Sequence, residues 1–194
     1  MFKEFKNLHT HVVTLLDTNL PSYLSYHDTK HTLYVLDKAI YIANKEGITK
    51  NDLCLLKIAA LFHDIGYIKA YDNHEEESIK IAKKELQNFS ISNDDIEVIC
   101  NMIRATKIPQ HPKTKLDMIL ADADLEYLST NNFKVFGDLL FEELKHLNPK
   151  LTRQEWNATQ ISFLKNHQYH TTYCKRYKEH RKQKNLDYLI ASHL

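Results

Sequence analysis

The sequence predicts an all-α protein, and both its composition and its hydrophobic periodicity indicate this fold class. The 194 residues include only three glycines and four prolines, whereas sheets and turn-rich folds need many more residues with positive φ angles or tight turns. Apolar residues recur at helical spacing between these few helix-breaking residues. A chain of this length is typical of one domain, so we expect residues 1–194 to form a single compact bundle of about nine helices.

Each expected helix has a residue typical of a helix end at one boundary or both. Thr152 and Glu155 form the clearest capping box, in the string TRQE. The helix that contains LCLLKIAALFHDIG is apolar on most sides, so we expect it to be the central, buried one. The helices are expected before Pro21, from Asp28 to Glu46, from Thr49 to Gly66, after Asn73, after Ser92, after Pro112, from Phe133 to Leu147, after Thr152, and over a basic segment near the C-terminus that either stands alone or continues the eighth helix.

Charge and cysteine content limit the partners and the compartment. The net charge is +1, but Lys165–Lys184 carries +6 and the remainder therefore −5. The low overall charge argues against a dedicated nucleic-acid binder. No apolar run approaches the length of about 20 residues that spans a bilayer, and we expect no membrane partner. Three cysteines without a CxxC pair indicate buried free thiols in a reducing compartment, so the expected location is the cytoplasm.

Three short strings place ionisable side chains on predicted apolar helices: YHDTKHTLYV, LFHDIGY and ILADADLEYL. Such groups are costly to bury unless something compensates them, and one divalent cation compensates several at once. Imidazole nitrogen and carboxylate oxygen without thiolate suit Mn, Fe, Co, Ni, Mg or Zn. The residues concerned are His27, His31, His63, Asp64, Asp122 and Asp124.

The order of these residues resembles the H…HD…D signature of the HD superfamily of metal-dependent phosphohydrolases, over roughly residues 26–128. The resemblance implies four metal ligands, His31, His63, Asp64 and Asp122, with His63 and Asp64 also catalytic. Asp122 matches the family's final Asp because that residue is the first acid of DADL strings. Asp124 then orients a ligand or is a surface acid. Residues 130–194 are expected to pack on the motif-bearing core.

The resemblance also implies the reaction and its cofactor. One or two divalent ions would activate water to attack a phosphomonoester or phosphodiester, and Asp64 bridges the ions in binuclear branches of the family. The expected partner is a small-molecule phosphate ester, such as a nucleotide. Four further residues are candidates to bind this substrate, although each has an alternative interpretation as a solvated or structural residue: His27, His74, Lys107 and Arg181.

Two other functions remain open from the sequence. A few HD-fold proteins are diiron oxygenases, and this activity would need two more histidine ligands, for which only His74 and His111 are well placed. A non-catalytic nucleotide sensor on the same scaffold is the third possibility. A sensor need not retain a complete ligand set, so the four candidate ligands favour an enzyme.

Overall fold

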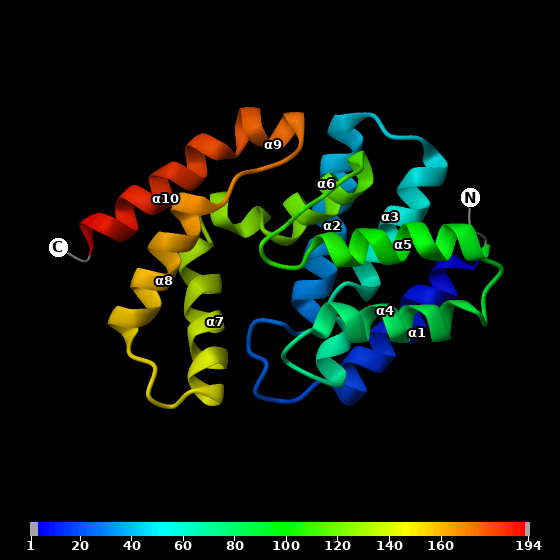
Figure 1. Ribbon diagram of the computed structural model, residues 1–194, viewed down its shortest axis with the longest axis horizontal. Helices are drawn as coiled ribbons and strands as arrows, with labels where there is room; N and C mark the ends of the chain where they lie inside the picture. Colours follow the sequence, from blue (N-terminus) through cyan, green and yellow to red (C-terminus); the bar gives the residue numbers. More distant parts are fainter. Residues whose placement is uncertain (1–3, 193–194) are drawn as a thin grey trace.

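The computed structural model describes residues 4–192, and this part of the chain is helical without a strand, as predicted. Ten α-helices and two short 3-10 helices follow one another along the chain (Figure 1). They are α1 (Phe5–Asn19), α2 (Thr29–Glu46), α3 (Lys50–Phe62), η1 (Ile65–Ile68), α4 (His74–Leu86), α5 (Asn93–Ala105), α6 (Lys115–Asp124), η2 (Glu126–Ser129), α7 (Phe133–Leu147), α8 (Arg153–Asn166), α9 (Thr172–Tyr177) and α10 (Glu179–Ala191).

Local capping determines several helix ends as the sequence predicts. The Thr49 side chain accepts a hydrogen bond from the Asp52 backbone N–H at the start of α3. At the start of α8, Thr152 and Glu155 form the reciprocal capping box. Gly47 follows α2 with a φ of 66°, a left-handed conformation that glycine adopts without steric cost. These ends therefore depend on nearby residues alone.

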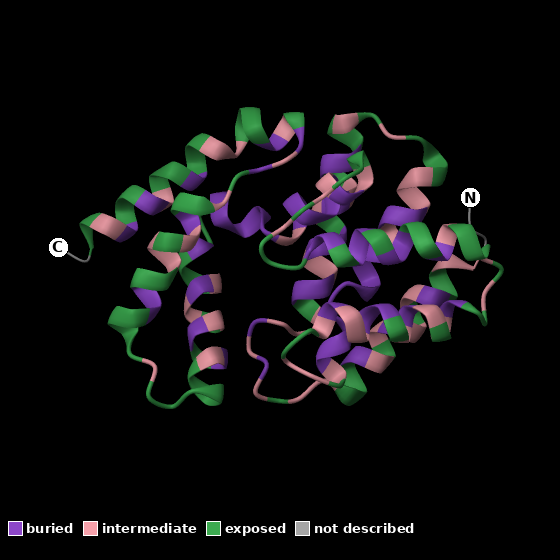
Figure 2. Cartoon of the chain, viewed as in Figure 1, coloured by how far each residue is buried: buried purple, intermediate pink, exposed green. Residues whose placement is uncertain are grey.

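The helices pack around two hydrophobic clusters. The larger cluster is built by α1–α6, with α3 at its centre, where Leu56, Ala59 and Phe62 are fully buried. The smaller cluster joins η2 and α7 to α8 and α10 through Leu128, Leu164 and other apolar residues. Figure 1 shows α7, α8 and α10 standing beside the group formed by α1–α6, and Figure 2 shows buried residues concentrated where helices face one another.

The basic C-terminal segment differs from the prediction of one helix. Residues 167–171 leave the helical conformation after α8, and the basic segment then forms two helices, α9 and α10. Tyr169, Tyr173 and Tyr177 recur every fourth residue in this segment. This tyrosine stripe is only partly a packing face, because Tyr169 is buried, Tyr173 is half-buried and Tyr177 is exposed. The stripe therefore turns away from the core along its length.

Two predictions about the chain's environment can be compared with residues 4–192. No helix in this range is long and apolar enough to cross a membrane. The cysteines are unpaired thiols; Cys100 and Cys174 are buried as expected, whereas Cys54 is half-buried.

Candidate metal centre

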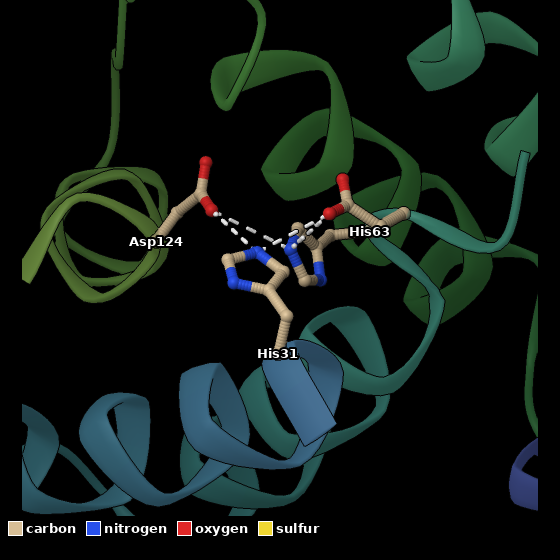
Figure 3. A group of neighbouring side chains, drawn as sticks. His31, His63 and Asp124 are labelled. Atoms are coloured by element: carbon tan, nitrogen blue, oxygen red, sulfur yellow. Dashed lines mark ion pairs between the residues drawn. The ribbon is translucent and has the colours of Figure 1, made fainter. Parts of the chain in front are cut away.

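Four ionisable side chains meet where the ends of three helices come together. His31 lies in the first turns of α2, His63 and Asp64 follow the last residue of α3, and Asp124 is the last residue of α6. The Nε2 atom of His31 lies 3.3 Å from Asp64 Oδ2 and 3.3 Å from Asp124 Oδ1. The Nε2 atom of His63 lies 3.2 Å and 3.5 Å from the same two oxygens. The labelled side chains in Figure 3 point toward one another from separate elements of the chain.

The polar atoms of this cluster lack ordinary hydrogen bonds. His31 Nε2, His63 Nε2 and Asp64 Oδ2 are buried and have no hydrogen-bond partner. On the other side of its ring, His63 Nδ1 lies 2.9 Å from the Ala60 carbonyl oxygen, to which a protonated Nδ1 donates. That tautomer leaves Nε2 with a free lone pair for a metal ion. The four ligand atoms lie within 4.8 Å of one another, so the residues fit one divalent cation with two nitrogen and two oxygen ligands.

The mutual attraction of these groups dominates their proton affinities. Burial alone would lower the pKa of His31, but the carboxylates of Asp124 and Asp64 raise it to about 9. The same carboxylates raise the pKa of His63 despite its burial. Burial opposes the ionised form of Asp124, yet the neighbouring His31 and His63 rings lower the pKa of this carboxyl to about 2. The cluster therefore holds a carboxylate pair that needs positive charge from protons or from a metal ion.

The structure corrects the choice of Asp122 as the acidic ligand from α6. Asp122 is fully buried but faces the segment between α8 and α9, where its carboxylate accepts hydrogen bonds from the backbone N–H groups of His170 and Thr171, both at 2.8 Å. It also accepts one from the Thr171 hydroxyl. Residues two apart on a helix point about 200° apart, so only one of the two acids can face His31, and that acid is Asp124.

His74 approaches the cluster from the first residue of α4. Its Nε2 atom lies 3.4 Å from Asp64 Oδ1, and its ring stacks on Tyr67 with centroids 3.9 Å apart. Gly66 permits this approach, because a Cβ atom there would lie 1.9 Å from the His74 carbonyl oxygen. His74 therefore lies beside the cluster, and its contact with substrate stays a prediction.

His27 also stacks on Tyr67, with ring centroids 4.4 Å apart. Its Nδ1 atom lies 2.5 Å from Oε1 of Glu143, a fully buried acid on α7 that the sequence analysis did not single out. The signal was present, because Glu143 follows Phe136 and Leu140 on the apolar face of α7 at helical spacing. An acid on such a face indicates a buried polar contact.

A cavity of about 460 Å³ opens beside the cluster and is lined at one end by Asp64, Asp124, His27 and His74. Its other end lies against α7 and α8. This α8 surface was not predicted from the sequence, although Trp156, Gln160 and Phe163 form a stripe at helical spacing. The cavity gives a small molecule access to the cluster.

Three other candidate residues lie away from this cavity. Lys107 is exposed and donates a hydrogen bond to Asn73 Oδ1 at 2.8 Å. His111 is exposed and lines a different cavity, together with Lys107. Arg181 lines a third cavity, with Tyr41 and other residues of α2, α9 and α10. Lys107 and Arg181 therefore line cavities other than the one beside the cluster, and their contacts with substrate stay predictions.

Comparison with known proteins identifies the family. A sequence model of the HD domain matches residues 29–126, just over half of the chain, and this range includes all four cluster residues. The crystal structure of a predicted HD superfamily hydrolase from an uncultured Thermotogales bacterium shares the fold, with a TM-score of 0.63 at 19% identity, over 94% of this chain and 90% of that one. Among curated proteins, no sequence matches significantly. The chain belongs to the HD-domain family.

Proposed function

We propose that this protein is a metal-dependent phosphohydrolase that cleaves a phosphomonoester or phosphodiester bond in a small molecule, with nucleotides among the candidate substrates. One observation carries the proposal: buried atoms of His31, His63 and Asp64 converge without hydrogen-bond partners next to an open cavity. Buried polar atoms are normally paired, so their arrangement favours a bound cation. HD-family membership supports the same assignment.

The residues around the cavity suit the steps of phosphate-ester hydrolysis. A divalent cation held by His31, His63, Asp64 and Asp124 would supply Lewis-acid chemistry, which polarises a phosphoryl oxygen and makes water a stronger nucleophile. His74, whose Nε2 atom lies 3.4 Å from Asp64 Oδ1, and His27 both line the cavity and would bind phosphoryl oxygens there. Glu143 holds the His27 ring in position through Nδ1.

The alternative functions receive less support from this geometry. An oxygenase with two iron ions would need His74 and His111 as extra ligands, but His111 is exposed and lines another cavity. A nucleotide sensor would need no set of metal-binding side chains, whereas four such side chains converge here. Hydrolysis is therefore the function that accounts for most of the arrangement.

Metal titration combined with a substrate panel tests the proposal. Purified protein would be loaded separately with Mn²⁺, Co²⁺, Ni²⁺, Mg²⁺ and Zn²⁺, and phosphate release would be followed from p-nitrophenyl phosphate, its bis ester and nucleotides. We expect activity that depends on the metal and is abolished by His63→Ala. His180→Ala is the matched control, because His180 is exposed and outside the cluster. Full activity of His63→Ala, or inactivity on every ester with every metal, would reject the proposed function.

A further inference from the structure

We propose that the cavity selects a monophosphate ester of a bulky apolar alcohol, and this inference rests on the proposed phosphohydrolase function. The cavity has two chemically different ends. The polar end contains Asp64, Asp124, His27 and His74. The opposite end is lined by apolar side chains from η2, α7, α8 and the residues beside them: Leu125, Leu128, Phe133, Leu140, Leu144, Trp156, Phe163 and Leu164.

The charge of the lining limits the number of phosphates that the cavity can accept. Among the described residues that line it there is no Lys or Arg, whereas Asp64, Glu75 and Asp124 are acidic. Sites for di- and triphosphates normally use cationic side chains that pair with the additional phosphoryl oxygens. A cation at the cluster would balance the negative charge of one phosphate group. A second phosphate would lie against a part of the cavity wall that carries no positive charge. The lining therefore favours a single phosphate.

The apolar end limits the group attached to that phosphate. Among the residues of η2, α7 and α8 that line the cavity, polar groups come from Tyr127, Trp156, Thr159 and Gln160. Two of these groups already have partners, because Trp156 Nε1 donates to the Gly137 carbonyl oxygen and Gln160 Nε2 lies within 3.4 Å of Asn157 Oδ1. A sugar buried there would lose water from several hydroxyl groups and gain few hydrogen bonds in return. An alkyl or aryl group would instead gain affinity from burial, by about fourfold for each methylene removed from water.

The size of the cavity agrees with such an occupant. Its volume of about 460 Å³ lies in the range of roughly 300–1,000 Å³ that is typical of small-molecule sites. The apolar end begins directly beside the acids of the cluster, since Leu125 follows Asp124 in the chain and also lines the cavity. One molecule can therefore place its phosphate at the cluster and its apolar group against α7 and α8.

The single tryptophan of the chain provides a binding signal that is independent of turnover. Trp156 lines the apolar end, so its fluorescence reports on occupancy there. Methyl-, butyl- and octylphosphonate, which resist hydrolysis, would be titrated into the metal-loaded protein, with ADP as the polyphosphate comparison. We expect affinity to rise with chain length, with octylphosphonate binding at least about a hundredfold tighter than methylphosphonate. Affinity that is independent of chain length, or tighter binding of ADP than of octylphosphonate, would overturn the inference.

Two neighbouring leucines on α7 provide matched variants. Leu140 lines the apolar end, whereas Leu139 is exposed and outside the cavity. Leu140→Asn should weaken octylphosphonate binding about tenfold or more, because it places an amide against the alkyl chain, and Leu139→Asn should leave it unchanged. Equal effects of the two substitutions would overturn the placement of the alkyl chain of octylphosphonate against Leu140.

Turnover measurements separate this inference from the proposed function. Octyl phosphate and 1-naphthyl phosphate would be compared with glycerol phosphate, a nucleoside monophosphate and ATP. We expect a kcat/KM at least about tenfold higher for one or both apolar esters. A higher kcat/KM for ATP or glycerol phosphate would overturn the selectivity and leave the phosphohydrolase function standing. Chain-length-dependent binding without release of phosphate from any ester would reject the phosphohydrolase function and retain an apolar ligand site.

Discussion

The Glu143 side chain on α7 lies directly against His27, with 2.5 Å between Oε1 and the ring Nδ1. The second oxygen, Oε2, accepts hydrogen bonds from the backbone N–H groups of Tyr26 and His27, both at 3.0 Å. One buried carboxylate therefore joins α7 to the loop before α2 and orients a histidine on the cavity wall.

Glu143→Gln should destabilise the protein by about 1–3 kcal/mol, because an amide cannot satisfy all the buried donors that the carboxylate satisfies. Urea denaturation measures this change. Glu142→Gln is the control, since Glu142 is the exposed neighbour, and its effect should stay within about 0.5 kcal/mol. A double-mutant cycle with His27→Ala should show that His27 and Glu143 are coupled in the free energy of unfolding. Additive effects of the two substitutions would mean that their contact does not contribute to stability.

The stability difference between the wild type and Glu143→Gln should depend on pH. Burial acts to raise the pKa of Glu143, but hydrogen bonds from the His27 side chain and backbone outweigh it and lower this pKa below its ordinary value of 4.5. A lowered native pKa means that the carboxylate stabilises the fold above pH 4.5 and that this contribution is lost as the pH falls through the native pKa. Urea unfolding at a series of pH values should therefore show the difference shrinking below pH 4.5. A difference that grows on acidification would contradict the assignment.

The two acids of α6 should have separable roles. Asp124→Asn should weaken Mn²⁺ binding at least about tenfold, because it removes a charged ligand, and isothermal titration calorimetry measures this loss. Asp122→Asn should retain Mn²⁺ binding but cost about 1–3 kcal/mol of stability, because Asp122 accepts the buried hydrogen bonds of Thr171. The opposite pattern, with metal binding lost only in Asp122→Asn, would restore Asp122 as the ligand.

Gly66→Ala should destabilise the protein strongly. The new Cβ would lie 1.9 Å from the His74 carbonyl oxygen and 2.6 Å from the Ser78 nitrogen, and both are backbone atoms that cannot move alone. We expect a cost at or above the usual overpacking range of about 1–3 kcal/mol, measured by thermal or urea unfolding. Gly137→Ala is the control, because its Cβ would meet only the flexible end of Gln160. Equal stability of the two variants would show that α4 lies farther from Gly66.

Arg181→Ala should leave hydrolysis unchanged, because Arg181 lines a cavity that contains none of the cluster residues. His74→Ala, at the cavity wall beside Asp64, should lower kcat/KM. Steady-state kinetics on the best ester compares the two variants. An increase in KM of more than about threefold for Arg181→Ala would indicate that the substrate reaches this residue.

Local patterns predicted the fold class and several caps, because each depends on neighbours in the sequence. The resemblance to the H…HD…D signature pointed to His31, His63 and Asp64, which the structure brings together. The choice between Asp122 and Asp124 depends on a distant segment. Asp122 holds the backbone of His170 and Thr171, and Thr171 in turn caps α9 by accepting a hydrogen bond from Cys174 N–H. The same contacts explain the break between α8 and α9, which no glycine or proline marks.

Glu143 could be recognised from the sequence as an unusual acid, but its partner could not. His27 lies 116 residues earlier, and no short-range pattern joins the two. The same limit applies to the cavity, whose apolar end comes from η2, α7 and α8 while its polar end comes from the loop before α2, from Asp64 after α3, and from α4 and α6. A cavity between segments that are distant in the chain emerges only when those segments pack.

This division of the cavity has a consequence for how its specificity can change. The four cluster residues all lie within 29–126, the range that the HD-domain family shares, whereas Leu140, Trp156 and Phe163 lie beyond it. On the proposed function, substitutions at these three positions would change the recognised group while the four cluster residues keep their geometry. If the proposed function holds, selection or protein engineering would alter the substrate through these positions of α7 and α8, provided that Glu143 keeps its contact with His27.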